Sequence, residues 1–162
     1  MIDMPKFEVI DPKPYHCSLM ARLLRDRHRD LLEKAGTNAH RTLRDSFDNS
    51  SYRRLLLIDG KVGILGGVVG PAISSTGYLW VAITDEAKKY PFAVVRVVKR
   101  EMAIIASTRR ELTSLVLYGD DRAQRFATFL GFDFSQEPQP ATDHAAFLMV
   151  YKPGENRSWP IQ

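Results

Sequence analysis

Cysteine is nearly absent from this chain, since Cys17 is the only one among its 162 residues. A lone cysteine forms no internal disulfide and cannot build a thiolate metal site, which favours an intracellular, reducing setting. Because Cys17 lies among residues at helical spacing, we interpret it as a small buried hydrophobe rather than a nucleophile. No pair of histidines has the spacing of a known zinc motif, and we therefore expect no metal site.

Long apolar runs are also missing. The longest span about eight residues, which is too short to cross a bilayer, and the N-terminal segment carries an early acid, Asp3, without a secretory pattern. We expect a cytoplasmic protein with no membrane contact. Its length, with 44% hydrophobic and 26% charged residues, predicts a single domain over residues 1–153. A polar, loosely ordered tail should follow over 154–162.

No strong excess of one charge is present, because the net charge is +4 and the basic residues are dispersed. In the densest stretch, 22–30, acids interrupt the arginines at helical spacing, which is typical of a solvated, salt-bridged helix face. Nucleic-acid binding is therefore the weakest of the functions considered. A mildly basic surface would also attract an anionic cofactor or an acidic partner.

Periodicity and turn signals predict the order of the elements. The Asp59-Gly60 pair indicates a tight hairpin, Pro91 suits the first position of a helix, and Gly131 suits the end of one. We expect loops over 84–90 and 136–143. Helices are expected at 15–32, 38–47, 92–107 and 122–130, and strands at 7–10, 54–58, 61–69, 77–83, 112–118, 132–135 and 145–151.

Three local features, in this order, carry a resemblance. They are the 59–60 hairpin followed by Val62-Gly63, the buried strand at 77–83 before a loop and a long helix, and Asp120-x-x-Ala123-x-x-Phe126-x-x-x-Leu130-Gly131-Phe132. From Phe7 to Lys152 the chain resembles the GNAT-type N-acetyltransferases. The resemblance implies an α/β (α+β) fold with a mixed, mostly antiparallel central sheet of about six or seven strands and about four flanking helices.

The resemblance also implies a cofactor, acetyl-coenzyme A. In that family the cofactor enters where two neighbouring strands splay apart, here 77–83 and 112–118, and its pyrophosphate lies at the start of the next helix. Backbone groups of the first strand would face the pantetheine arm. The residues that the resemblance assigns to cofactor binding are Val81, Ala82, Ile83, Lys88, Lys89, Tyr90, Pro91, Phe92, Ala93, Asp120, Ala123 and Phe126.

The phosphate-binding loop departs from the family pattern, Arg/Gln-x-x-Gly-x-Gly/Ala. Pro91 replaces the first glycine and contributes no N–H, and Phe92 places a bulky side chain close to the expected phosphates. Lys88 and Lys89 can compensate, although as mobile point charges rather than a fixed cradle. We expect weaker coenzyme A binding than in a typical member.

The catalytic groups of the family are harder to find. Ala127 stands where the family usually has a tyrosine as general acid, and the strand at 77–83 carries no carboxylate for a base. Tyr118 and Asp120, at the expected mouth of the cleft, are the catalytic candidates. The alternative interpretation is structural, with Tyr118 as a strand-end aromatic and Asp120 as a helix cap.

A narrower similarity is to the small acetyltransferase-like proteins of tailed bacteriophages, which share the compact layout and the missing glycine loop. It implies an infected bacterial cytoplasm as the setting. The first hypothesis is acetyl transfer to an amine of a protein, such as a host protein, or of a small molecule. The alternative is a catalytically idle protein that binds a host or virion protein, because function belongs to the site and not to the fold. A homodimer is left open.

Overall fold

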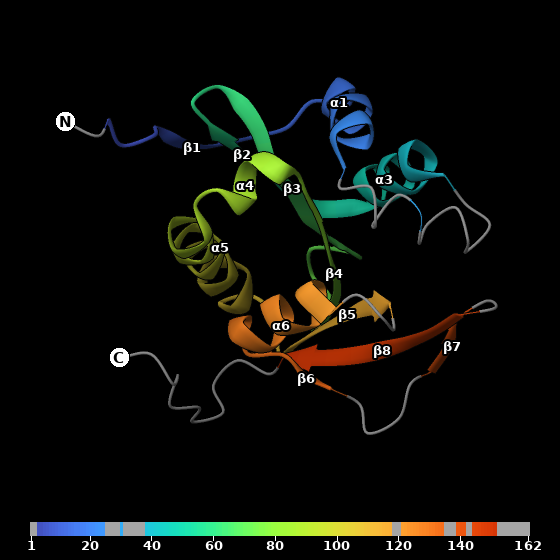
Figure 1. Ribbon diagram of the computed structural model, residues 1–162. Coiled ribbons are helices and arrows are strands. Elements are labelled where there is room, and N and C mark those ends of the chain that lie inside the picture. The colour runs from blue at the N-terminus through green and yellow to red at the C-terminus, as the bar shows by residue number, and fades with distance from the viewer. Residues whose placement is uncertain are drawn as a thin grey trace.

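The computed structural model describes residues 3–24, 30, 38–117, 121–134, 139–141 and 144–151, and shows a central sheet with helices on both faces (Figure 1). The predicted tail at 154–162 lies outside the described residues. The helices are α1 (Tyr15–Leu23), α3 (Ala39–Asp48), α4 (Asp85–Lys88), α5 (Pro91–Ala106) and α6 (Asp121–Leu130). The strands are β1 (Phe7–Ile10), β2 (Ser50–Ile58), β3 (Lys61–Val69), β4 (Thr76–Ile83), β5 (Glu111–Leu117), β6 (Asp133–Phe134), β7 (Gln139–Ala141) and β8 (His144–Tyr151).

The sheet is mixed and mostly antiparallel, which confirms the expected fold class. Its order is β1-β2-β3-β4-β5-β8-β6, with β7 also paired to β8. The β4–β5 pair is parallel, and the other pairs are antiparallel. The sheet therefore falls into two antiparallel halves, β1–β4 and β5–β8, that meet along one parallel pair.

Within the described residues the sheet has eight strands, which is more than the number expected, about six or seven. The stretch 136–143 was wrongly interpreted as a loop, because Gln139–Ala141 pairs with the first residues of β8. Strand β6 pairs near the other end of β8, at Val150 and Met149. Together β6 and β7 cover the edge of β8 that faces away from β5, and satisfy backbone groups that an open edge would leave unpaired.

Local signals placed most element ends correctly. The Asn38 side chain accepts a hydrogen bond from the Arg41 N–H over 2.8 Å and caps α3. Asp59 and Gly60 have positive φ of 50° and 77°, as a two-residue hairpin turn requires. Strand β2 starts at Ser50, earlier than residue 54, because Ser50 and Tyr52 pair with the end of β3. Tertiary pairing there overrides polar composition.

Residues 84–90 were wrongly interpreted as a loop throughout. Asp85–Lys88 forms the short helix α4, with Thr84 as its N-cap. Thr84 is buried, and its hydroxyl donates to the carbonyl oxygen of Val62 over 2.9 Å. This contact fixes α4 against β3. The described chain therefore has five helices rather than the four expected.

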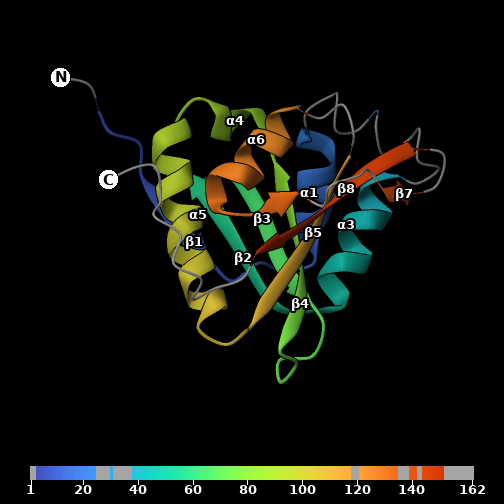
Figure 2. The same ribbon diagram turned by 90° about the horizontal axis from the view of Figure 1, so that it is seen from below.

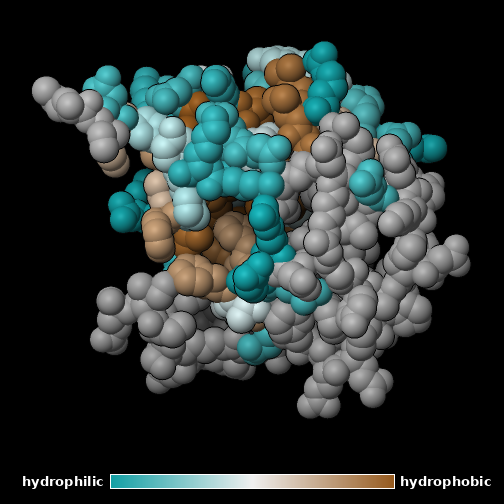
Figure 3. All heavy atoms as spheres, in the orientation of Figure 1, coloured by the Kyte–Doolittle hydropathy of each residue, from teal (hydrophilic) through white to brown (hydrophobic). Residues whose placement is uncertain are grey.

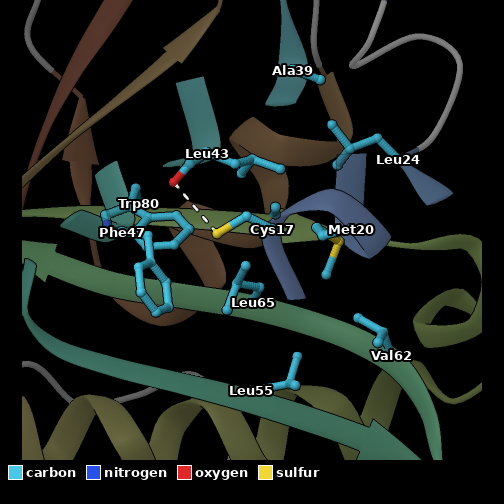
Figure 4. Close-up of a cluster of buried hydrophobic side chains, with 11 residues drawn as sticks. Cys17, Met20, Leu24, Ala39, Leu43, Phe47, Leu55, Val62, Leu65 and Trp80 are labelled. Atoms are coloured by element: carbon cyan, nitrogen blue, oxygen red, sulfur yellow. Dashed lines mark hydrogen bonds between the residues drawn. The ribbon is translucent and has the colours of Figure 1, made fainter. Parts of the chain in front are cut away.

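One half of the core lies between the sheet and the helices α1 and α3. Figure 4 shows Cys17 and Met20 from α1, Leu43 and Phe47 from α3, and Trp80 from β4 in this cluster. The Cys17 thiol is fully buried beside the Leu43 carbonyl, and burial raises its pKa. Cys17 is therefore the small buried hydrophobe that the sequence indicated.

The opposite face of the sheet is covered by α5 and α6, as Figure 2 shows. Val68, Leu79 and Leu112 from the sheet pack there against Met102 of α5 and Leu130 of α6. Because β4 is covered on both faces, its nearly continuous apolar sequence is explained. Among the helices that the structure describes, none combines the length and apolarity needed to cross a membrane.

Candidate functional site

The two parallel strands β4 and β5 are paired over only part of their length. Their ladder contains three residue pairs and ends at Tyr78 and Thr113. Beyond that point β4 continues to Ile83 and β5 to Leu117, without further pairing between them. The Ser114 hydroxyl donates to the Leu79 carbonyl over 2.9 Å at the end of the ladder. We call the opening between residues 79–83 and 114–117 the splay.

Alternate residues of β4 direct their peptide groups to opposite edges of the strand. The Leu79 carbonyl points to β5, whereas the Thr84 N–H donates to the Gly63 carbonyl of β3 over 3.0 Å. By this alternation the peptide groups of Val81 and Ile83 face the splay, and that of Ala82 faces β3. Of the three predicted strand residues, two therefore offer backbone hydrogen bonds to a molecule in the splay.

A pocket of about 390 Å³ lies where β4 ends and α5 begins. Figure 3 shows apolar residues gathered in a hollow beside α4 and α5. The described residues of the pocket walls are apolar, apart from Lys88 and Arg122. The residues that line it are Ile83, Ala87, Lys88, Pro91, Val94, Val95, Arg122 and Phe126. It combines an apolar interior with two cations, and so suits a ligand with an apolar arm and an anionic group.

The start of α5 supplies further positive potential. Pro91 occupies the first helical position, and the Val94 N–H donates to the Tyr90 carbonyl over 3.0 Å. The amides of Phe92 and Ala93 lie in the first turn, where a helix has no carbonyl partner to offer. The Phe92 side chain is 84% exposed, so its ring does not fill the pocket. Tyr90 packs edge-on against Phe7, with ring centroids 5.8 Å apart.

Both predicted lysines are paired with acids of α4. Lys88 lines the pocket, and its ammonium lies 2.8 Å from the Asp85 carboxylate. The Lys89 ammonium lies 2.9 Å from Glu86, and the hydrogen bond and charge of Glu86 raise the pKa of Lys89. Lys89 is not among the residues that line the pocket. Much of the positive charge expected from the two lysines is thus neutralised by the acids of α4.

Helix α6 contributes one predicted and one missed residue. Phe126 lines the pocket as expected, and Arg122, one turn before it, lines the pocket as well. The i,i+4 spacing of these two residues was a signal that could have identified Arg122. Ala123 lies in the same helix, and Ala127 is buried against the core. The catalytic candidates Tyr118 and Asp120 lie outside the described residues.

Comparisons with known proteins identify the fold. No protein-family model matches the sequence, and no curated protein matches it. Solved structures do match, among them a GNAT-family acetyltransferase from Streptococcus pneumoniae, with a TM-score of 0.62, 14% identity, and coverage of 91% of this chain and 99% of that one.

Two further matches were solved with coenzyme A. Spermidine N-acetyltransferase from Vibrio cholerae, in complex with coenzyme A and spermine, has a TM-score of 0.63 at 12% identity and covers 90% of this chain and 95% of its own. RimL, the ribosomal L7/L12 α-N-protein acetyltransferase, in complex with coenzyme A, has a TM-score of 0.60 at 12% identity. The match covers 90% of this chain and 93% of RimL. The chain therefore has the fold of the GNAT acetyltransferases.

Proposed function

We propose that this protein binds acetyl-coenzyme A in the splay and transfers the acetyl group to an amine of a protein or a small molecule. The observation that carries the proposal is the early end of the β4–β5 ladder, which opens onto the pocket at the start of α5. An open edge inside a sheet costs backbone hydrogen bonds. A ligand with amide groups, such as the pantetheine arm, would restore them.

The residues present fit this cofactor. The peptide groups of Val81 and Ile83 can pair with the amides of pantetheine in the manner of an added strand. The apolar pocket walls suit the methylene groups of the arm, and the first-turn amides of α5 suit its phosphates. Pro91 removes one N–H donor from this cradle. The fit therefore supports binding with fewer backbone donors than a glycine loop supplies.

The reaction requires proton transfer at two atoms. When bound, acetyl-coenzyme A would supply the acetyl group as a thioester, so that one group must take a proton from the attacking amine and another must give one to the departing thiolate. Tyr118 and Asp120 stay the predicted acid and base. The solved neighbours include enzymes named for a polyamine and for a protein amine as acceptor. Both belong to the class of acceptors proposed here.

Binding can be tested with a pair of variants on α5. Val95→Trp would fill the pocket, whereas Ile104→Trp introduces the same side chain at a half-exposed position of the same helix outside it. At about 100 times its dissociation constant, acetyl-coenzyme A should stabilise the wild type and the Ile104→Trp variant by about 2.7 kcal/mol. The Val95→Trp variant should lose this stabilisation, which is measured as the shift in melting temperature on adding the cofactor. A wild type with no shift at saturating cofactor would reject the proposal.

A second candidate function is a catalytically idle protein that uses this fold to bind another protein. Two observations favour it: Ala127 is small and buried, and β4 carries no carboxylate. Coenzyme A binding without release of free thiol from acetyl-coenzyme A, over a panel of polyamines and peptide amines, would select this candidate. A phage-infected bacterial cytoplasm, a host or virion protein as partner, and a homodimer stay predictions from the sequence.

A further inference from the structure

The cations around the pocket are not equivalent. Lys88 points its ammonium at Asp85, and Lys89 pairs with Glu86 outside the lining. Arg122 is exposed, lines the pocket, and forms no ion pair within the part of the chain that the structure describes. A lysine–aspartate pair carries no net charge. Among the described residues of this pocket, the guanidinium of Arg122 is therefore the main source of uncompensated positive charge.

The position of Arg122 relates it to the start of α5. Phe126, one turn later on α6, forms the apolar wall of the pocket together with Val94 and Val95 of α5. Arg122 lines the same pocket as Pro91, the first residue of α5. A ligand anion at the amides of α5 would thus lie between a helix start and a guanidinium. Arginine is suited to such a role because its planar fork can donate two parallel hydrogen bonds to phosphate oxygens.

We propose that Arg122 binds the diphosphate of coenzyme A and replaces the charge that the degenerate loop no longer supplies. This inference rests on the proposed function, because it assumes that the pocket holds this cofactor. Pro91 removes one backbone donor, and Asp85 neutralises the lysine that stands at the basic position of the loop. A side chain from α6 then supplies the specificity for the phosphates.

Calorimetric titration of the full chain can measure this role. The ligands are coenzyme A, dephospho-coenzyme A, which keeps the diphosphate, and pantetheine, which has neither phosphate group. The variants are Arg122→Gln and, as a matched control, Arg125→Gln, which removes the same charge from an exposed residue of the same helix outside the pocket. Because Arg122 is exposed, unliganded Arg122→Gln should melt as the wild type does.

Arg122→Gln should lower the affinity for coenzyme A and for dephospho-coenzyme A by about tenfold or more, because hydrogen bonds to charged groups are stronger than those between neutral groups. It should leave pantetheine binding unchanged, and Arg125→Gln should change none of the three. Equal losses in the two variants would overturn the inference, as would a loss limited to coenzyme A, which would place the contact at the 3′-phosphate. A wild type that binds none of the three ligands would instead reject the proposed function itself.

Discussion

The Ser114 hydroxyl donates a hydrogen bond to the Leu79 carbonyl over 2.9 Å at the point where β4 and β5 cease to pair. A side chain thus takes the place of the next backbone donor of β5 and ends the ladder without leaving Leu79 unsatisfied. The bond defines the closed end of the splay. Leu79 is buried, so its carbonyl group would be costly to leave without a hydrogen-bond donor.

Ser114→Ala should lower the free energy of unfolding by about 1 kcal/mol, because the Leu79 carbonyl loses its donor. Urea unfolding of the two proteins gives the difference. Ser114→Thr keeps a hydroxyl and suits a strand, so it should retain most of the lost stability. An alanine variant as stable as the wild type would show that water or a backbone shift replaces the bond.

Phe92→Glu should stabilise the protein and weaken coenzyme A binding. A carboxylate in the first turn of α5 interacts favourably with the positive end of the helix, which is worth about 0.3–1 kcal/mol. The same carboxylate would repel the phosphates of the cofactor. Thermal unfolding and calorimetric titration should therefore change in opposite directions. Phe92→Gln removes the ring without adding charge, and a loss of affinity as large in this variant would contradict the electrostatic explanation.

His16 should make stability fall as the solution becomes acidic. Burial lowers the pKa of His16 from its usual 6.5, and its Nδ1 accepts a hydrogen bond from the Lys13 N–H over 2.8 Å. Below pH 6.5 the unfolded chain binds the proton more readily than the folded chain, so the stabilisation present above this pH is lost as pH falls.

The measurement is the free energy of unfolding between neutral and mildly acidic pH. His16→Gln keeps an acceptor near the Lys13 N–H without a group that titrates in this range. The variant should show a shallower decrease over the same range. Parallel pH profiles for the two proteins would show that other groups cause the acid sensitivity.

Tyr52 should make the stability of the protein fall at alkaline pH. Its hydroxyl donates to the Glu101 carboxylate, and burial together with this carboxylate raises the pKa of Tyr52 to about 12. Since the unfolded phenol ionises near pH 10, the folded state loses stability as pH rises from about 10 through about 12. Tyrosinate absorbance should show a late-titrating component that is missing in Tyr52→Phe. A titration unchanged by the substitution would contradict the assignment.

The parts of the fold that the sequence predicted rest on local chemistry. The hairpin at Asp59-Gly60 needs positive φ, Pro91 suits a helix start, and Gly131 ends α6 with a φ of 101°. Strand β7 and the early start of β2 depend on partners that are distant in the chain. Such pairing leaves no periodic signal within a short polar segment, so sequence patterns alone missed both.

The opening between β4 and β5 was expected from the sequence, whereas the charge balance of the pocket beside it was not. The splay followed from the family resemblance and not from residue patterns. Because 84–90 was interpreted as a loop, the helical spacing that brings Asp85 to Lys88 and Glu86 to Lys89 was missed. Without those pairs both lysines looked free to bind phosphate. Recognising α4 would have directed attention to Arg122.

Three residue pairs of backbone ladder join β4 to β5, whereas each of these strands is paired along six residues with its antiparallel neighbour. The line between the two halves is therefore held by half as many residue pairs as the antiparallel ladder on either side of it. A molecule bound in the splay would connect the two halves of the sheet as an inserted strand would. Amide hydrogen exchange should then slow in β5 and β8 as well as in β4 when the ligand is present.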